Sequence, residues 1–223
     1  MKRPISTLAQ GQRIAADSEL LPPAVTPKGA KGKVLNAALQ LFAQAGYGAT
    51  SVRDICKAAK VQTTTLYSHF PSKEHVLAEI IGLGYAEHYK RIKDALAASA
   101  DEPLARLAAV VRAHVISHCE YPMLAVVANT ESHFLSPELA ESVVVTLQQS
   151  ETVLAEILLQ CQEAGVFDVP DIYLALRAIG GMGMRVAFWY EPGCGMTPQH
   201  VADTYAEFAL RLVGAGKPSP SLC

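Results

Sequence analysis

Helical periodicity, interrupted at short intervals by proline and glycine, is the feature that most constrains the fold of this chain. Apolar residues recur three and four positions apart from Gly29 onward. No segment shows the alternation of a half-buried strand. The sequence therefore predicts an all-α fold, with helices at about 29–45, 52–59, 63–70, 73–98, 103–120, 122–134, 137–164, 171–190 and 198–213. Half of the residues are apolar, which is enough to form a core.

Local start and stop signals divide residues 29–75 into three short helices and the start of a longer one. Gly46 supplies a C-terminal stop, and Ser51 with Asp54 three residues later can form a capping box. Pro71 ends the third helix, and Ser72 can cap the next. Two short helices braced by a first one form a helix-turn-helix, whose third helix enters the major groove of DNA. We expect this arrangement here.

Charge is distributed unevenly along the chain. Residues 28–75 carry seven basic and two acidic residues, whereas residues 76–223 carry nine basic and seventeen acidic ones. A basic front on an acidic body predicts an anionic partner, either a nucleic acid or a membrane surface. No apolar run reaches the roughly 18 residues that a membrane span needs, and residues 1–27 lack the core of a signal peptide. We expect a cytoplasmic protein with no membrane partner.

A family resemblance is carried by the run VLNAALQLFAQAGYGATSVRDICKAAKVQTTTLYSHFPSKEHVL. Its Ala-Ala-x-x-Leu-Phe helix, Gly-Tyr and Thr-Ser bridge and Thr-Leu-Tyr-x-His-Phe-x-x-Lys-Glu block resemble the N-terminal signature of TetR-family transcriptional regulators. The resemblance implies a helix-turn-helix DNA-binding domain at 29–75 and a larger C-terminal helical ligand-binding and dimerisation domain at 76–213. Composition predicts a flexible arm at 1–28 and a flexible tail at 214–223.

The resemblance also implies roles for individual residues. Tyr67 and His69 match positions that contact the DNA backbone, and Lys73 matches a phosphate-binding position at a helix N-terminus. Thr63 and Thr64 match positions that read bases. The predicted DNA-binding residues are Arg53, Gln62, Thr63, Thr64, Thr65, Tyr67, His69 and Lys73.

Two residues depart from the family pattern. Lys60 stands where the family often has glycine, and its Cβ costs on the order of 1 kcal/mol if the turn needs a left-handed backbone. Gln62 stands where a small cap such as serine is common. The third helix therefore starts either directly after Gln62 or one residue later, with Thr63 as its cap.

In the C-terminal region, His114 and His118 lie four residues apart on one predicted helix face. That spacing suits two metal ligands, but no third ligand follows at a diagnostic spacing, so we interpret both as pocket or packing residues and expect no metal and no cofactor. Arg185 either anchors an anionic ligand or packs in a dimer. Nothing places a base beside any cysteine, so we expect no catalytic residues and no enzymatic activity. The candidate ligand-binding residues are His114, His118, Met123, Asn129, Phe134, Met184, Arg185 and Trp189.

These observations predict a ligand-responsive transcriptional repressor. By resemblance, it pairs as a homodimer through 171–190 and 198–213, binds a palindromic operator in double-stranded DNA, and is released by a small apolar or amphipathic effector. The run from Trp189 to the last helix is similar to a subgroup that senses acyl-CoA thioesters. One alternative is a ligand-binding or protein-interaction module that no longer uses its DNA-binding scaffold. Another is a metalloprotein using His114 and His118.

Overall fold

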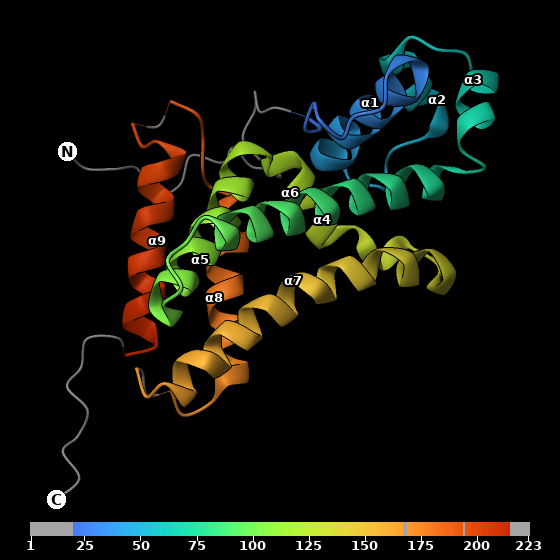
Figure 1. Ribbon diagram of the computed structural model, residues 1–223. Helices are drawn as coiled ribbons and strands as arrows, with labels where there is room; N and C mark the ends of the chain where they lie inside the picture. Colours follow the sequence, from blue (N-terminus) through green and yellow to red (C-terminus); the bar gives the residue numbers. More distant parts are fainter. Residues whose placement is uncertain (1–19, 167–168, 194, 215–223) are drawn as a thin grey trace, which may run out of the picture.

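The computed structural model describes residues 20–166, 169–193 and 195–214 (Figure 1). Over these ranges the chain is helical and contains no strand, so the all-α prediction is confirmed. The helices are α1 (Gly29–Ala45), α2 (Val52–Ala59), α3 (Thr63–His69), α4 (Lys73–Ala97), α5 (Pro103–Glu120), α6 (Pro122–Thr130), the 3₁₀ helix η1 (Ser132–Phe134), α7 (Pro137–Glu163), α8 (Ile172–Val186) and α9 (Pro198–Leu212).

Helix ends follow the local signals in the sequence. Gly46 ends α1 with a positive φ of 90°. Ser51 and Asp54 form the predicted capping box: the Asp54 N–H donates to Ser51 Oγ, and the Ser51 N–H donates to Asp54 Oδ2. Ser72 caps α4 by accepting from the His75 N–H. Such caps satisfy the first backbone donors of a helix, so the boundaries depend on few residues.

The turn between α2 and α3 has the backbone geometry that the family's glycine would favour. Lys60 is left-handed, with φ 54° and ψ 47°. Gln62 is the N-cap residue of α3, although its side chain makes no capping hydrogen bond, and the helix begins at Thr63. The alternative in which Thr63 is the cap is therefore wrong. Fully buried Leu66 and nearly buried Phe70 hold α3 against the other helices, which offsets the low helix propensity of its threonines.

Replacing Lys60 with Gly is expected to stabilise the fold. The substitution removes a left-handed strain of about 1–2 kcal/mol and adds backbone entropy worth about 0.5–1 kcal/mol to the unfolded chain, for a net gain near 0.5–1 kcal/mol. Denaturant unfolding measures the change. Lys60→Ala is the control because it removes the same charge and keeps the Cβ; an equal gain in that variant would show that charge, not strain, is responsible.

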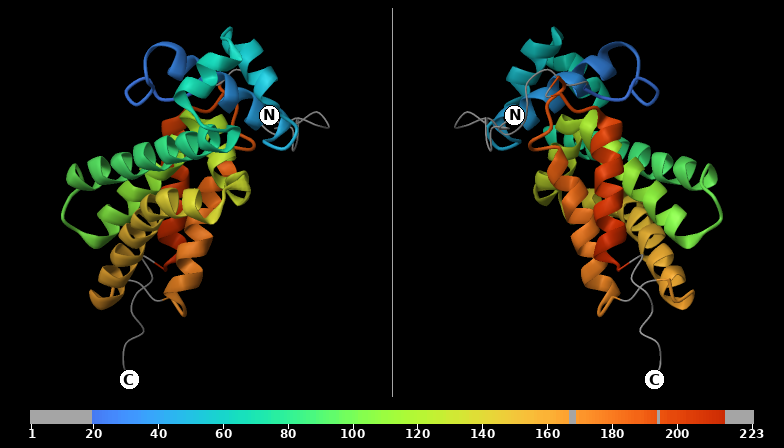
Figure 2. Two further views of the ribbon diagram at one scale, coloured as in Figure 1. Left: turned by 90° about the vertical axis from the view of Figure 1, so that its right-hand side faces the viewer. Right: turned by 90° about the vertical axis from the view of Figure 1, so that its left-hand side faces the viewer.

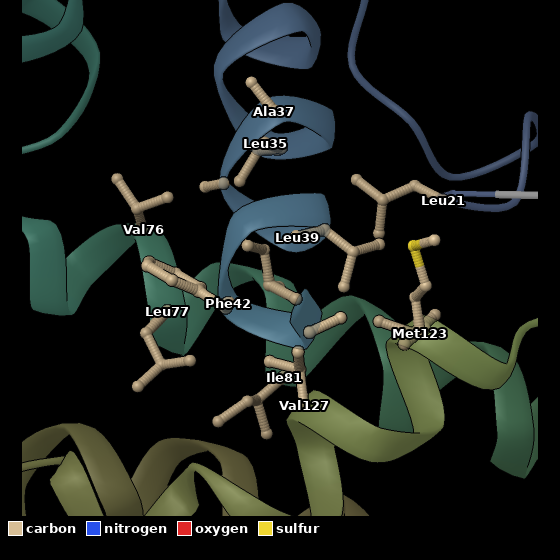
Figure 3. Packing of buried hydrophobic residues seen from close by; sticks show 14 of the residues in the cluster. Leu21, Leu35, Ala37, Leu39, Phe42, Val76, Leu77, Ile81, Met123 and Val127 are labelled. Carbon is tan, nitrogen blue, oxygen red and sulfur yellow. The ribbon is translucent and has the colours of Figure 1, made fainter. Parts of the chain in front are cut away.

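The hydrophobic core forms two clusters. Beneath α1, Leu39 and Phe42 lie among Leu77 and Ile81 of α4 and Val127 of α6 (Figure 3). The second cluster fills the space among α5, α7, α8 and α9. Since α4 and α6 both contribute to the first cluster, the helix-turn-helix unit shares its core with the C-terminal region.

The segment before α1 packs against it. Leu21 is buried in the first cluster (Figure 3), and its N–H donates to Asn36 Oδ1 at 3.1 Å. A Cβ on Gly32 would lie 1.9 Å from the Pro27 carbonyl oxygen, so the segment passes directly over α1. Residues 20–28, which the predicted flexible arm includes, therefore pack against α1, because an apolar anchor follows the polar stretch. The rest of that arm, 1–19, and all of the predicted tail except Gly214 lie outside the described residues.

Two predicted helices are shorter than expected. The helix predicted at 122–134 ends at Thr130 and is followed by the 3₁₀ turn at 132–134. The helix predicted at 171–190 ends at Val186, and residues 187–189 form a turn. Helices α8 and α9 lie side by side along one face of the molecule (Figure 2, right). Within the described ranges, no helix is long and apolar enough to cross a membrane.

Candidate nucleic-acid interface and internal cavity

Helix α3 presents a polar surface at the outer edge of the molecule (Figure 1). Thr63, Thr64, Tyr67 and His69 are exposed, and Tyr67 is 52 % exposed although it is a large aromatic residue. These side chains offer hydroxyl and imidazole groups, which can hydrogen-bond to base edges and phosphates. The spacing of the inward-facing Leu66 and Phe70 turns this face outward.

The remaining predicted contacts are distributed around the same surface. Gln62 is exposed immediately before α3, and Arg53 is exposed on α2. Thr65 is half-buried, and its carbonyl oxygen accepts from Ser68 Oγ at 2.8 Å. The Thr65 side chain is therefore partly covered, while Gln62 and Arg53 are accessible to a partner.

Lys73 faces the protein to a greater extent than the sequence indicated. Its Nζ donates to the carbonyl oxygens of Tyr47 and Thr50, both at 2.8 Å, and lies 3.9 Å from the centre of the Tyr47 ring. Desolvation lowers the pKa of Lys73. The ammonium group thus links the start of α4 to the α1–α2 turn, and this role competes with the predicted phosphate contact.

Replacing Lys73 with Met is expected to lower the free energy of unfolding by about 2 kcal/mol, because two charged hydrogen bonds are lost while the apolar stem is kept. The slope of log affinity for DNA against log salt should stay unchanged. If Lys73 instead binds a phosphate, the magnitude of the slope should fall by about 0.9 for each bound chain. Urea unfolding and a salt series of DNA titrations separate the two roles.

A cavity of about 220 Å³ lies in the C-terminal region, between α4, α5, α6, α7 and α8. Its wall is mainly apolar, with Val110, Val111, Leu124, Leu154 and Ile179 among the lining residues. Polar side chains contribute a smaller part of the wall surface. A mainly apolar wall with few polar groups is typical of sites for small organic ligands.

Four of the eight predicted ligand-binding residues line this cavity: His114, His118, Asn129 and Met184. The other four lie elsewhere. Met123 is buried in the first core cluster (Figure 3), and Phe134 packs against the rings of Tyr47 and His133. Arg185 is exposed, with its guanidinium over the Phe188 ring, and Trp189 stacks on Tyr205. Helical periodicity places a residue on a face but does not reveal what that face meets.

Charged side chains lie at the edge of the cavity. Arg177 pairs with Glu151 at 3.1 Å, and both side chains are about half exposed. Arg91 pairs with Glu87 at 2.8 Å and with Glu120 at 2.6 Å. The cavity therefore combines an apolar interior with a charged margin.

Sequence reasoning missed His88, which joins His114 and His118 in the cavity wall. His88 lies on α4, 26 residues before His114, so no spacing rule connects them. The available signal was its place on the inward face of α4, three residues after Tyr85 and four before Ile92. Burial lowers the pKa of all three histidines: that of His118 falls to about 3, and that of His88 falls well below its ordinary value. The cluster is therefore neutral at neutral pH.

Comparison with family models covers both halves of the chain. The model of bacterial regulatory proteins of the tetR family matches residues 34–80. The model of the tetracyclin repressor-like C-terminal domain matches residues 100–213, about half of the chain. The chain belongs to the TetR family.

Relatives of this TetR-family protein match most of its length. The HTH-type transcriptional repressor KstR2 of Rhodococcus jostii is 28% identical in an alignment of 197 residues that covers 85% of this chain and 95% of KstR2. A tetR-family regulatory protein from Rhodococcus RHA1 has a similar crystal structure, with a TM-score of 0.78 at 30% identity, covering 85% of this chain and 99% of that one. The ketosteroid transcriptional regulator KstR2 of Mycobacterium tuberculosis has a TM-score of 0.77 at 28% identity, covering 86% and 97%.

These matches confirm the predicted class of protein. The chain is a DNA-binding transcriptional regulator of the TetR family and not an enzyme. Members of this family bind operator DNA and small effectors. Helices α2 and α3 lie within the region that the tetR-family model matches, and most of the residues that line the cavity lie within the region that the C-terminal model matches.

Proposed function

We propose that the protein is a homodimeric repressor, which binds a palindromic operator through two copies of α3 and is released when an amphipathic effector fills the cavity. The observation that carries the proposal is that α4 and α6 connect the core of the DNA-binding unit to the wall of the cavity. Each contributes to the core beneath α1, and each lines the cavity. A ligand that changes how these two helices pack therefore acts directly on the support of the DNA-binding unit.

The DNA contacts are proposed from exposure and chemistry. Thr63 and Thr64 read base edges, while Tyr67 and His69 bind the phosphate backbone. Arg53 and Gln62 flank this surface and supply further polar contacts. Two such surfaces, related by the twofold axis of a dimer, would reach successive major grooves about 34–36 Å apart.

Helices α8 and α9 form the proposed dimer face. Large apolar side chains are exposed along it, among them Leu174 on α8 and Phe208 and Leu212 on α9. Gly181 is also exposed on α8, and a Cβ there would meet nothing within 4 Å, so a second helix could approach closely. Exposed apolar surface of this kind favours self-association.

The effector class follows from the cavity. An apolar body would fill the interior, and a polar or anionic group would meet Arg177 or Arg91 at the margin. Acyl-CoA thioesters and degradation products of steroids both combine an apolar body with a polar or anionic group. The similarity to KstR2, a ketosteroid regulator in Mycobacterium tuberculosis, supports the same class.

Hydrogen bonds connect the cavity wall to the DNA-binding unit. The Tyr85 hydroxyl on α4 donates to the Ala128 carbonyl on α6 at 2.9 Å, and burial raises its pKa to about 12. Just past the end of α6, Glu131 Oε2 accepts from the Tyr47 N–H at 3.1 Å. Tyr47 in turn lies in the α1–α2 turn that Lys73 holds. An effector that prefers a different arrangement of α4 and α6 would shift the population away from the DNA-binding state.

Selection from randomised duplex DNA tests the proposal. We expect enrichment of one inverted repeat, bound as two chains per duplex, with an affinity that falls as salt rises. Native mass spectrometry of protein purified from its host then identifies any retained effector, which should weaken binding to the selected repeat. The absence of an enriched repeat would favour the alternative of a module that does not use its DNA-binding scaffold.

A further inference from the structure

Three histidines converge on the wall of the cavity. His88 comes from α4, and His114 and His118 come from successive turns of α5. One nitrogen from each ring can be chosen so that the three atoms all lie within 4.8 Å of one another. His118 is buried and the other two histidines are partly buried, and the rings are in mutual contact, with centroids 4.4–5.9 Å apart.

Hydrogen bonds to carbonyl groups determine which nitrogens carry protons. His114 Nε2 lies 3.1 Å from the Gly180 carbonyl oxygen, and His118 Nδ1 lies 2.7 Å from the His114 carbonyl oxygen. A carbonyl only accepts, so both of these nitrogens are protonated. An imidazole that carries a single proton has a lone pair on its other nitrogen, so His114 Nδ1 and His118 Nε2 are the nitrogens available as ligands. His88 Nε2, 2.9 Å from His114 Nδ1, donates its proton to that lone pair.

This arrangement is that of metal-binding histidines. Such histidines usually donate their second N–H to a carbonyl or carboxylate, which fixes the tautomer and the ring orientation. Two of the three rings already make this outer contact. The backbone also leaves room for the cluster: a Cβ on Gly183 of α8 would lie 2.0 Å from His114 Cδ2. An apolar wall would need neither the glycine nor three imidazoles.

We propose that His88, His114 and His118 bind one divalent transition-metal ion, with zinc as the first candidate, at the wall of the cavity. Zinc bonds of about 2.0–2.1 Å to three nitrogens need nitrogen–nitrogen separations of about 3.4 Å in a tetrahedral site. His88 Nε2 and His114 Nδ1 therefore separate by about 0.5 Å, and the His88 proton moves to Nδ1.

The fourth position of the ion faces the cavity. Three neutral imidazoles leave the ion with its full positive charge, so water or an anionic group such as a carboxylate or thiolate completes the site. This inference does not depend on the proposed effector, because metal binding is measured without one. It replaces the expectation that His114 and His118 serve only as pocket or packing residues. The third ligand, which the sequence spacing did not reveal, is His88.

The test uses the untagged full chain after treatment with a chelator and removal of that chelator. Calorimetric titration with zinc chloride is expected to show one ion per chain, and cobalt chloride should give the absorption of a four-coordinate ion. Zinc should also raise the thermal midpoint, since it binds only the folded state. The separate variants His88→Gln and His118→Gln should each bind zinc at least about 100-fold more weakly.

Two controls keep the test specific. His133→Gln removes an exposed histidine outside the cluster and should bind as the unchanged chain does. Gly183→Ala keeps all three ligands but places a methyl group where the His114 ring lies, and should weaken binding by about 10–100-fold. The proposal is overturned if the unchanged chain fails to take up one ion, or if His88→Gln binds zinc as tightly as His133→Gln. If His88→Gln or His118→Gln does not fold, zinc binding by the unchanged chain and by Gly183→Ala tests the proposal.

Discussion

Replacing Phe208 with Glu is expected to produce a folded monomer that binds the selected operator at least about 100-fold more weakly. Phe208 is 45 % exposed on α9, within the proposed dimer face. In a twofold dimer the substitution places two carboxylates near each other in an apolar interface, and a buried unpaired charge costs several kcal/mol. A single chain then contacts one half-site only, and the loss of the second half-site removes most of the specific affinity.

Light scattering after size-exclusion chromatography measures the mass, and fluorescence anisotropy with the selected duplex measures the affinity. The matched control is Leu159→Glu, because Leu159 is 47 % exposed but lies on α7, outside the proposed face. It should remain dimeric and bind normally. A dimeric Phe208→Glu variant with full affinity, or an equal loss in Leu159→Glu, would show that the interface lies elsewhere.

The second large effect is a loss of DNA affinity when Tyr67 on α3 is replaced with Phe. Tyr67→Phe removes only the hydroxyl of a 52 % exposed side chain, so folding should be unaffected. Losing one hydrogen bond to a phosphate costs about 1.5 kcal/mol per half-site, and two half-sites together give a loss of roughly 100-fold in affinity. Because phosphates are the same in every sequence, the loss should be similar for all duplexes, and the preferred repeat should not change.

Thr64→Val is the matched variant, since valine keeps the shape of threonine and removes its hydroxyl. Thr64 is exposed on the same helix. Selection with this variant should return a repeat that is altered or relaxed at one symmetric pair of positions, because a base contact carries sequence information. If Tyr67→Phe changes the preferred repeat and Thr64→Val weakens all duplexes equally, the division of roles on α3 is wrong.

The sequence predicted the elements whose signals are local. The Ser51–Asp54 capping box, the Gly46 stop and the Ser72 cap each involve residues within a few positions, and the structure contains all three. The helix ends at these signals therefore agree with the predicted boundaries. The ordered match to the TetR signature likewise depends on one continuous run.

Contacts between distant segments were not predictable in this way. His88 meets His114 only because α4 and α5 pack together, and Glu131 meets Tyr47 across 84 residues. Lys73 was expected to face DNA, but two carbonyl oxygens within reach of its Nζ hold it against the α1–α2 turn. Met123 is predicted to bind ligand because the two sides of α6 are similarly apolar in sequence. In the fold, the side of α6 that carries Met123 packs in the first core cluster with α1.

The length of helix α4 determines how far a small tilt at the cavity displaces the end of the helix beside α3. Its 25 residues form one uninterrupted α-helix, which at 1.5 Å per residue is about 37 Å long. The part of α4 that lines the cavity ends at Ile92, which lies 19 residues, or about 28 Å, from Lys73. A tilt of about 5° around Ile92 would displace the end beside α3 by about 2.5 Å, which approaches the rise of one base pair, about 3.4 Å. In the proposed dimer, a rotation of this size at the cavity would therefore move the two α3 surfaces out of step with the bases.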